Sequence, residues 1–411
     1  MKKLLAFMLI SVFLAPFTVI STERKQSKYF DKIPVNPNFS QTISTFPTQN
    51  LTGKTQKLAP NSSFKIKELT INKKKIPIFK LSNGRFIKAS RSNIYEDVVL
   101  KKMNYDRNYW LKANFSIYNT PYTVSAEKIN TKLTSFSKVH VSQRAVTKHG
   151  VYMKVDNQGW VAEKKLSLQD NRMEKVQNLL NKKYNKANYS IYVKQLRTQK
   201  SAGINSNKVM YSASVTKLPI LYFTERQIQE GKFKLSDKLK YVEQVNHFKG
   251  AYKVEGSGEM PKKADNKNYT VDYLLKAVAQ HSDNVASNIL GYYIAHKYDE
   301  AYQTTITKAV KTNWNMEKRD VSSKTAATIM ESLYSQKDLI LKYLSSTDFD
   351  NTRISRDITV PVAHKIGDAY DYKHDVAVVY AGEPFILSIF TDKASYENIT
   401  TIANDVYGVL K

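Results

Sequence analysis

Hydrophobic and polar residues are spaced differently in the two parts of this chain. The first third consists of short β-prone runs broken by Asn, Gly and Ser, a pattern typical of small β domains. From about Asp170 the apolar residues fall at helical spacing instead, beginning with Met173, Val176, Leu179, Leu180 and Tyr184. We therefore expect a β-rich N-terminal part and a mixed C-terminal part.

Strands and helices are interleaved in the C-terminal part. "YSIYVKQL", from Tyr189, predicts a strand, and the apolar run after Lys217 predicts a buried helix that continues to about Gly231. Thr270 suits the N-cap of a further helix. "DVAVVY" and "FILSIF" are predicted strands of a hairpin, and apolar spacing at the C-terminus predicts a closing helix. These elements imply an α/β (α+β) fold, with one antiparallel sheet assembled from remote segments and covered by helices.

The first third repeats itself at a period of roughly 75 residues. "NFSQTISTFP" begins at Asn38 and "NFSIYNTPY" at Asn114, and later "FKLSNGRFIKA" is similar to "MKVDNQGWVAEKK". The later pair each contain a turn glycine, Gly84 or Gly159, followed by an aromatic residue. Both copies therefore have the composition of short strands joined by turns.

These copies resemble SH3-like wall-binding modules of the Gly-Trp type. The resemblance implies two small SH3-like β-barrels, at residues 22–100 and 101–167, ahead of a larger domain at residues 168–411. An alternative is that both barrels serve only as a stalk.

The overall composition limits the chemistry that the chain can perform. Its 411 residues suffice for two or three domains, and 42% hydrophobic residues allow a sizeable core. The chain has no cysteine, which excludes disulfides, thiol catalysis and thiolate metal sites. The seven histidines show no paired-ligand spacing, so we expect neither a metal nor another cofactor.

The first residues have the pattern of an export signal. Lys2 and Lys3 precede the apolar run from Leu4 to Ile20, which Pro16 interrupts. We interpret residues 1–21 as a cleaved signal peptide, with an uncleaved anchor as the alternative. The expected location is secreted or extracellular, associated with the cell wall or the membrane surface.

The net charge of +28 is concentrated near the N-terminus. Residues 22–167 hold 27 basic and 9 acidic side chains, whereas residues 168–411 hold 35 and 27. A basic exported segment suits a polyanionic partner, such as peptidoglycan or an anionic wall polymer. The export signal argues against nucleic acid, the general alternative for a basic chain.

The stretch "YSASVTK" places Ser214 and Lys217 three residues apart. On a helix these residues share one face, so the pair can provide a nucleophile and its base. Spacing alone is weak support, since Ser62 with Lys65 shows the same pattern, as does a pair at residues 135 and 138. The alternative is a capping serine beside a solvated lysine.

Two further motifs follow in order along the chain. "HSDNVASNIL" contains Ser282, Asp283 and Asn284, and "VAHKIGDA" contains Lys365 and Gly367. The ordered set Ser-x-x-Lys, Ser-Asp-Asn and Lys-Thr-Gly is the signature of penicillin-binding proteins and class A β-lactamases. From about residue 170 to the C-terminus the chain resembles this superfamily, and its class A branch more closely.

A lysine activates a serine only when its amine is uncharged. For Lys217 this requires lowering the pKa from about 10.4 to near neutrality, which corresponds to roughly 4 kcal/mol. Burial and a second cation, for which Lys365 is the candidate, both act in this direction.

The resemblance implies a role for each remaining motif residue. Ser282 would relay the proton to the leaving group, and Asn284 would hold the substrate amide. The N–H groups of Ser214 and of Asp368, which follows Gly367, would form the oxyanion hole. Lys365 would also attract a substrate carboxylate, whereas Asp283 is interpreted as a helix cap.

The chain departs from the class A pattern at two points. Those enzymes clear the acyl-enzyme with a glutamate in a Glu-x-x-Leu-Asn loop, and no such sequence lies between Asn284 and Lys365. Glu317 is the nearest candidate. Ile366 replaces the usual hydroxyl residue of the third motif, which removes a hydrogen bond worth about 0.5–1.5 kcal/mol.

We therefore predict an exported, wall-associated serine hydrolase that acts through an acyl-enzyme on Ser214. The resemblance implies D-alanyl peptides or esters as substrates and a β-lactam as a possible covalent ligand. Two alternatives stay open: a class A-like β-lactamase, and a wall-binding protein whose hydrolase fold is catalytically idle.

Overall fold

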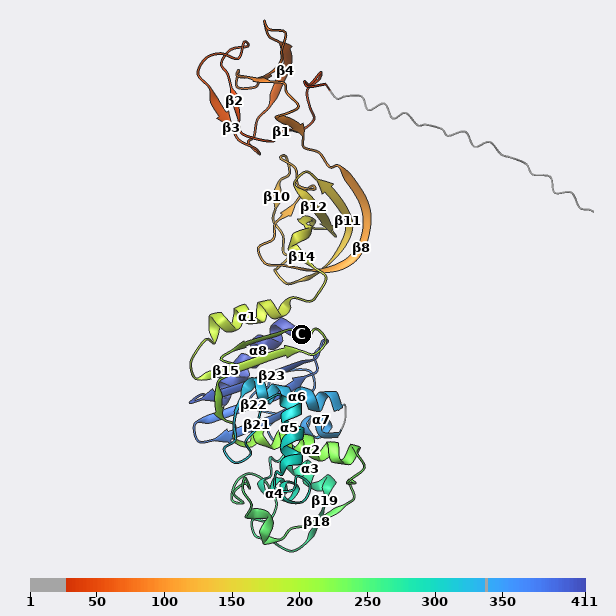
Figure 1. Ribbon diagram of the computed structural model, residues 1–411, viewed down its shortest axis with the longest axis vertical. Helices are drawn as coiled ribbons and strands as arrows, with labels where there is room; N and C mark the ends of the chain where they lie inside the picture. Colours follow the sequence, from red (N-terminus) through yellow and green to blue (C-terminus); the bar gives the residue numbers. More distant parts are fainter. Residues whose placement is uncertain (1–26, 337–338) are drawn as a thin grey trace, which may run out of the picture. The chain divides into compact units, whose positions relative to one another are not determined.

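The computed structural model describes residues 27–336 and 339–411 (Figure 1). The predicted signal peptide, residues 1–21, lies outside the described residues. The described chain forms two compact units. The first contains residues 27–107, 116–131 and 140–164, and the second contains residues 108–115, 132–139 and 165–411. No helix in the described part of the chain has both the length and the hydrophobicity that crossing a membrane requires.

The first unit is built from short antiparallel strands, as the sequence predicts. In its N-terminal part the paired strands are β1 (Pro37–Phe39) with β7 (Ile94–Glu96), β2 (Ile43–Thr45) with β3 (Gln56–Leu58), and β4 (Ile66–Ile71) with β5 (Pro77–Leu81) and β6 (Phe86–Lys88). Their buried core consists of Phe30, Phe39, Phe79, Leu81, Ile87, Ala89 and Ile94.

A second group of strands follows in the order β10-β9-β13-β12-β11. Their bounds are β9 (Ile117–Tyr118), β10 (Lys128–Ile129), β11 (Lys138–Thr147), β12 (Gly150–Val155) and β13 (Gly159–Ala162). Gly159 has φ +128°, and a Cβ there would lie 2.6 Å from the carbonyl oxygen of Tyr118. This predicted turn glycine therefore occupies a position where a larger residue does not fit.

The second unit contains an antiparallel five-stranded sheet in the order β16-β15-β23-β22-β21. Its strands are β15 (Tyr189–Gln195), β16 (Ser201–Ile204), β21 (Val362–Ala369), β22 (Tyr372–Val379) and β23 (Phe385–Asp392). Because β15 pairs directly with β23, the sheet joins segments from opposite ends of the domain. This arrangement and the β22–β23 hairpin confirm the predicted topology.

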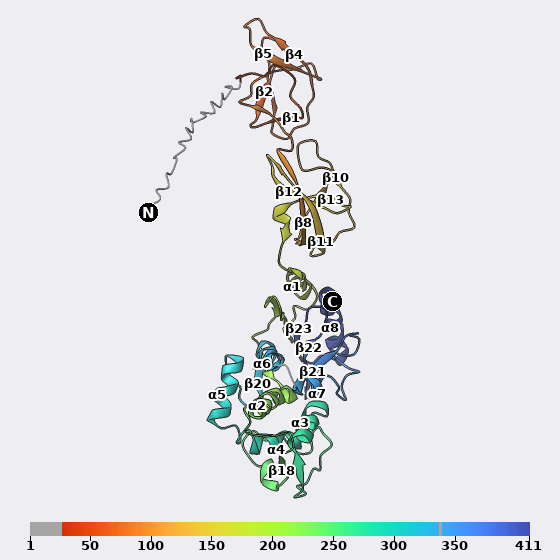
Figure 2. The same ribbon diagram turned by 90° about the vertical axis from the view of Figure 1, so that its right-hand side faces the viewer.

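Helices cover both faces of this sheet (Figures 1 and 2). One layer consists of α1 (Arg172–Lys183) and α8 (Tyr396–Leu410). The other contains α2 (Lys217–Gln229), α3 (Val271–Gln280), α4 (Asn284–Tyr293), α5 (Glu300–Val310), α6 (Ser323–Gln336) and α7 (Leu339–Leu344). Along β22, Val376 and Val378 join the larger core, whereas Ala377 and Val379 join the core beneath α1 and α8. The strand reads as a continuous apolar run because both of its faces are buried.

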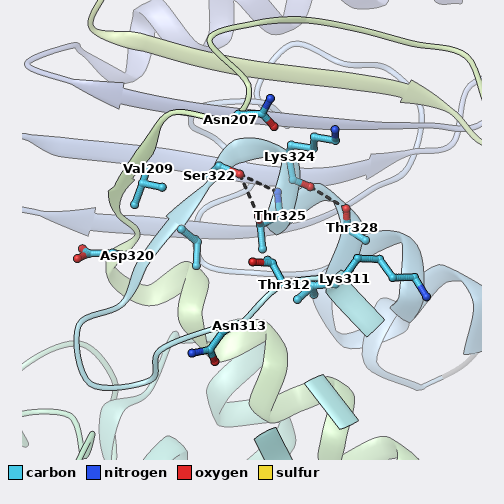
Figure 3. A pocket seen from close by; sticks show the side chains of 12 residues that line it. Asn207, Val209, Lys311, Thr312, Asn313, Asp320, Ser322, Lys324, Thr325 and Thr328 are labelled. Atoms are coloured by element: carbon cyan, nitrogen blue, oxygen red, sulfur yellow. Dashed lines mark hydrogen bonds between the residues drawn. The ribbon is translucent and has the colours of Figure 1, made fainter. Parts of the chain in front are cut away.

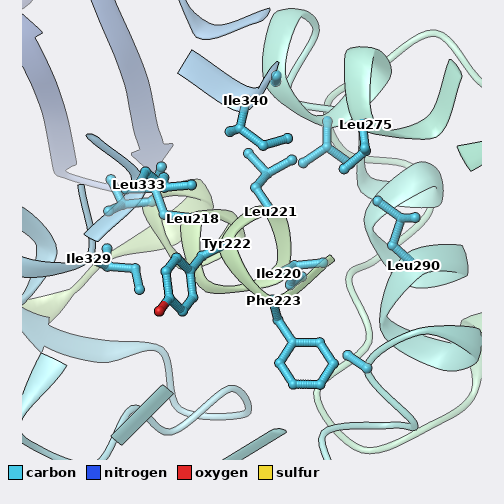
Figure 4. Close-up of a cluster of buried hydrophobic side chains, with 14 of the residues drawn as sticks. Leu218, Ile220, Leu221, Tyr222, Phe223, Leu275, Leu290, Ile329, Leu333 and Ile340 are labelled. Carbon is cyan, nitrogen blue, oxygen red and sulfur yellow. The ribbon is translucent and has the colours of Figure 1, made fainter. Parts of the chain in front are cut away.

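Helix α2 lies at the centre of the larger layer. Its residues from Lys217 to Glu225 are all buried, and Leu221 and Phe223 lie among side chains of the surrounding helices (Figure 4). A helix that is apolar around its whole circumference must be enclosed by other elements. The buried helix predicted after "YSASVTK" is therefore confirmed.

The remaining elements are β8 (Lys101–Leu111) paired with β14 (Leu166–Ser167), β17 (Val209–Tyr211) paired with β20 (Asp320–Ser322), β18 (Lys238–Lys240) paired with β19 (Asn268–Thr270), and the 3-10 helices η1 (Glu163–Lys165), η2 (Ala213–Thr216) and η3 (Glu243–Asn246).

Candidate active site

Ser214 lies in the 3-10 helix η2, directly before α2. This turn is 3-10 rather than α-helical, and it leads directly into the buried helix that the apolar run after Lys217 predicts. Pro219 provides the physical reason, because it has no N–H to donate to the carbonyl of Val215 four residues earlier. Instead, the N–H of Lys217 bonds to the nearby carbonyls of Ser214 and Val215.

The turn that carries Ser214 is fixed by its neighbours. The backbone N–H and the hydroxyl of Ser212 each donate to the carbonyl oxygen of Arg319, both at 2.8 Å. The hydroxyls of Ser212 and Thr216 lie 2.5 Å apart, and the indole N–H of Trp314 donates to Thr216 Oγ1 at 3.2 Å. These bonds hold the nucleophile candidate from both sides.

Lys217 is fully buried and points at the two serines of the motifs. Its Nζ lies 3.1 Å from Ser214 Oγ and 3.4 Å from Ser282 Oγ. It also lies 2.5 Å from the carbonyl oxygen of Ser282 and 2.6 Å from Asn284 Oδ1. The first two motifs therefore converge on a single amine.

The surroundings of Lys217 favour its uncharged form. Burial lowers the pKa of Lys217 well below its usual value, and the positive charge of Lys365 acts in the same direction. The Asp283 carboxylate opposes the shift, but with less effect. The sequence-based requirement for a neutral amine beside Ser214 is met by these surroundings.

Lys365, on β21, contacts Ser282, the serine that Lys217 also approaches. Its Nζ lies 2.8 Å from Ser282 Oγ and 3.1 Å from the carbonyl oxygen of Ile366. Burial lowers the pKa of Lys365 to about 7, although Asp375 acts in the opposite direction. Ser282 has φ +52°, in the left-handed region, and lies between the two lysines.

Asp283 and Asn284 shape the start of α4. Asp283 Oδ1 accepts from the N–H of Ala286 at 2.8 Å, which confirms the predicted helix cap. Asn284 joins Lys217 through Oδ1, and its Nδ2 donates to the carbonyl of Lys253 at 2.7 Å. Since a primary amide has two N–H donors, this bond uses one of them.

Gly367 brings β21 against the nucleophile turn. A Cβ at this position would lie 2.6 Å from the carbonyl oxygen of Ser212 and 3.0 Å from Val215 Cγ2. Its neighbour Asp368 accepts from Arg353 Nη2 at 2.6 Å and from the hydroxyl of Tyr396. The Asp368 carboxylate is thus held by these two residues, while its backbone continues the strand beside Ser214.

Comparison with known families agrees with this geometry. A model of the "Beta-lactamase enzyme family" matches residues 171–410, more than half of the chain. The chain belongs to this β-lactamase enzyme family. The resemblance inferred from three short motifs is thereby confirmed at the level of the family and its fold. A model for a domain of unknown function, DUF5776, matches residues 29–94, so the SH3-like assignment of that region stays a prediction.

Solved structures of the same fold cover 58% of this chain. They include PBP-A (18% identity, 96% of that chain, TM-score 0.49) and a β-lactamase from Sphaerobacter thermophilus (16% identity, 96% of that chain, TM-score 0.47). A β-lactamase from Francisella tularensis matches with 18% identity over 98% of its chain and a TM-score of 0.47. A search of curated proteins found no match.

Glu317, the sequence candidate for the deacylating glutamate, forms no hydrogen bond or ion pair with Lys217 in the described part of the chain. Glu317 Oε2 instead lies 3.1 Å from Lys249 Nζ, in an exposed ion pair. Within residues 27–336 and 339–411, no carboxylate forms an ion pair with Lys217. Arg319 and Tyr252, which sequence reasoning missed, lie near this amine instead. Neither residue belongs to a recognisable motif.

A pocket of about 540 Å³ lies beside β17 and β20 (Figure 3). None of the seven predicted site residues lines it. The residues that line it are Asn207, Val209, Val310, Lys311, Thr312, Asn313, Asp320, Val321, Ser322, Lys324, Thr325 and Thr328. This pocket is therefore separate from the Ser214–Lys217 constellation.

Proposed function

We propose that this protein is an exported, cell-wall-associated serine hydrolase that forms an acyl-enzyme on Ser214. The observation that carries the proposal is the 3.1 Å separation of Lys217 Nζ and Ser214 Oγ, with the amine fully buried beside a second lysine. A buried neutral amine at this distance accepts the hydroxyl proton as Oγ attacks a carbonyl carbon.

The proton has a route to the leaving group. After attack, the protonated Lys217 lies 3.4 Å from Ser282 Oγ, which in turn is bonded to Lys365. In the proposed step Ser282 donates its proton as the bond to the leaving group breaks and recovers a proton from Lys217. The N–H groups of Ser214 and Asp368 are proposed to stabilise the oxyanion. Water or another nucleophile then releases the acyl group.

The proposed substrates are D-alanyl peptides or esters of the cell wall. Lys365 supplies positive charge for a substrate carboxylate, and Asn284 supplies an amide for the substrate backbone. One similar solved structure, a point variant of PBP-A, holds penicillin G as an acyl-enzyme complex. We propose that a β-lactam likewise acylates Ser214.

Wall association is proposed to come from residues 22–167. Their net charge of +18 favours a polyanionic partner, and their short strands suit small binding modules of the SH3-like type. Salt weakens such attraction, because the Debye length falls to about 3 Å at 1 M ionic strength. Retention of the full chain on purified peptidoglycan should therefore decline steeply between 0.05 M and 1 M salt. Retention that is insensitive to salt would contradict an electrostatic partner.

Labelling with a fluorescent penicillin tests the proposed chemistry. We expect a stable adduct whose peptide mass assigns it to Ser214, and no adduct on the Ser214→Ala protein. Fast turnover of nitrocefin without a persistent adduct would instead support a class A-like β-lactamase. Absence of both an adduct and turnover, with intact wall binding, would support the catalytically idle alternative.

A further inference from the structure

Arg319 links two segments that meet at the proposed active site. It lies in the segment between α5 and β20, with φ +55°. Its carbonyl oxygen accepts both hydrogen bonds from Ser212 at 2.8 Å, two residues before Ser214. The backbone of Arg319 is therefore one of the supports of the nucleophile turn.

The side chain of Arg319 holds a different loop. Its Nη2 donates to the carbonyl oxygens of Gly250 at 3.0 Å and Ala251 at 3.1 Å. Its guanidinium carbon lies 3.8 Å from the centre of the Tyr252 ring. Three consecutive residues of the 250–252 loop thus contact one guanidinium group, whose planar shape suits both stacking and forked donation.

Tyr252 forms the aromatic wall next to Lys217. Its ring centre lies 4.7 Å from Lys217 Nζ, and the residue is 5% exposed. Asn288 fixes its backbone: the N–H of Tyr252 donates to Asn288 Oδ1 at 2.6 Å, and Asn288 Nδ2 donates to its carbonyl at 2.9 Å. The position of Tyr252 therefore depends on Arg319 on one side and on α4 on the other.

We propose that Arg319 is a positioning residue for acyl transfer, holding the Ser214 turn with its carbonyl and the Tyr252 wall of Lys217 with its guanidinium. This inference rests on the proposed function, since it concerns the same nucleophile and base. Its chemical consequence is that Arg319 supports the geometry of Ser214 and Lys217 indirectly, through Ser212 on one side and Tyr252 on the other.

The buried polar atoms around Arg319 also point to a functional arrangement. Among the described residues, Arg319 Nε and the hydroxyls of Tyr252 and Tyr298 are buried without a hydrogen-bond partner. Such groups are few in folded proteins, because leaving them unpaired opposes folding. Two of these residues meet beside the proposed base, since Arg319 stacks on the Tyr252 ring and that ring lies 4.7 Å from Lys217 Nζ, which supports a role of this packing in the site.

Removing the guanidinium has a predictable electrostatic effect. Burial is the largest cause that lowers the pKa of Lys217. The positive charges of Lys365, Arg319 and Lys262 lower it further, whereas the Asp283 carboxylate raises it. Loss of the Arg319 charge should raise the pKa of Lys217. The rising limb of the acylation rate against pH should then move to higher pH.

The test compares the full-length protein with its Arg319→Met and Arg319→Lys variants. Acylation by a fluorescent penicillin is measured from pH 5 to pH 10. For Arg319→Met we expect at least a tenfold loss at pH 7 and a rising limb displaced to higher pH. Arg319→Lys retains the positive charge but lacks the planar guanidinium group. Its acylation rate should therefore fall, while the rising limb of that rate stays at the wild-type pH. Arg226→Met, which removes an exposed arginine of α2, is the matched control and should match the wild type.

The outcomes separate this inference from the proposed function. Acylation of the wild type on Ser214, with an unchanged rate and limb in Arg319→Met, would overturn only the role of Arg319. If Arg319→Met were acylated more slowly but the rising limb stayed at the wild-type pH, Arg319 would have a purely structural role. That result would also overturn the proposed role of Arg319. Hydrogen exchange needs no acylation, and we expect faster exchange at residues 250–252 and 212–217 in Arg319→Met. Unchanged exchange there would contradict the proposal even if the wild type formed no adduct.

Discussion

Lys365 Nζ lies 2.8 Å from Ser282 Oγ, and this contact joins the third motif to the second. Lys217 approaches the same hydroxyl oxygen to 3.4 Å, so Ser282 lies between two buried amines. With the pKa of Lys365 lowered to about 7, this lysine is partly charged at neutral pH and remains able to donate to Ser282. A serine bonded in this way can pass a proton without becoming charged itself.

Replacing Ser282 with alanine should therefore slow acylation. General acid–base groups contribute about 10²- to 10⁴-fold to rates, and we expect a loss in this range for Ser282→Ala. Rapid-quench labelling with a fluorescent penicillin measures it. Ser287→Ala is the matched control, because Ser287 is a buried serine of α4, the helix that begins two residues after Ser282, and its hydroxyl donates to the carbonyl of Asp283. An acylation rate for Ser282→Ala within threefold of the control would contradict the proton relay.

The second prediction concerns Gly258, which lies against the cap of α4. It has φ +109°, and a Cβ there would lie 2.1 Å from Asp283 Oδ2 and 2.4 Å from Asp283 Cα. Gly258→Ala should destabilise the fold by more than about 2 kcal/mol, because both a left-handed backbone and a clash with fixed atoms oppose it. It should also slow acylation, since Asp283 lies between Ser282 and Asn284. Urea unfolding and adduct formation measure the two effects.

Gly231 supplies the control for this experiment. It has φ +73°, but a Cβ there meets no atom within 4 Å. Gly231→Ala should therefore show only the backbone penalty, about 1 kcal/mol, with acylation unchanged. Equal destabilisation by the two substitutions would show that the contact with Asp283 contributes nothing.

The third prediction concerns a buried histidine next to Lys365. His364 Nδ1 lies 3.0 Å from Asp375 Oδ2, and its Nε2 lies 3.0 Å from Asp350 Oδ1. Burial disfavours the charged imidazole, but the Asp375 charge and the bond to Asp350 outweigh it and raise the pKa of His364 to about 9. An unfolded histidine titrates near pH 6.5. The folded chain therefore binds more protons between these two values.

The sign of the stability change follows from that difference. The contribution of His364, up to about 3 kcal/mol, should be fully present below pH 6.5 and lost as the pH rises through 9. Asp350→Asn removes one charge and should reduce the pH dependence relative to the wild type. Lys217 and Lys365 also contribute to the pH dependence of stability, but they do so in both proteins, so their contributions cancel when the two proteins are compared. Urea midpoints at pH 6, 7.5 and 9 measure it, and parallel curves for the two proteins would refute it.

Much of this site could be predicted from the sequence, because its chemistry is carried by local patterns. The position of Ser214 and Lys217 follows from a three-residue spacing next to an apolar helix, and Asp283 was predictable as a cap from its place before α4. The sheet was also predictable, since β22 and β23 are continuous apolar runs joined by a short turn. In these cases the residue pattern that predicts the feature lies within one short segment of the sequence.

The parts that could not be predicted depend on contacts between loops. Arg319 and Tyr252 stack although 67 positions separate them, and neither segment has a periodic pattern. Their meeting is set by how the 250–252 loop closes over Lys217, which no local spacing encodes. The 3-10 turn at Ser214 was missed for a related reason, because the effect of Pro219 on the preceding turn outweighs the helical periodicity that follows it.

The last prediction concerns release of the acyl group. A water molecule attacks an acyl-enzyme rapidly only when a base takes its proton, and in class A enzymes a glutamate beside the lysine is that base. Here the nearest sequence candidate, Glu317, is 54% exposed at its side chain and paired with Lys249. Such exposed pairs contribute only about 0–1 kcal/mol to stability, so Glu317→Gln should fold normally. We expect its adduct with a fluorescent penicillin to persist as long as that of the wild type, within twofold, when fluorescence is followed after free label is removed. Persistence of both adducts over many minutes would fit transfer to a nucleophile other than water, whereas a Glu317→Gln adduct that outlives a short-lived wild-type adduct would identify Glu317 as the deacylating base and favour β-lactam hydrolysis.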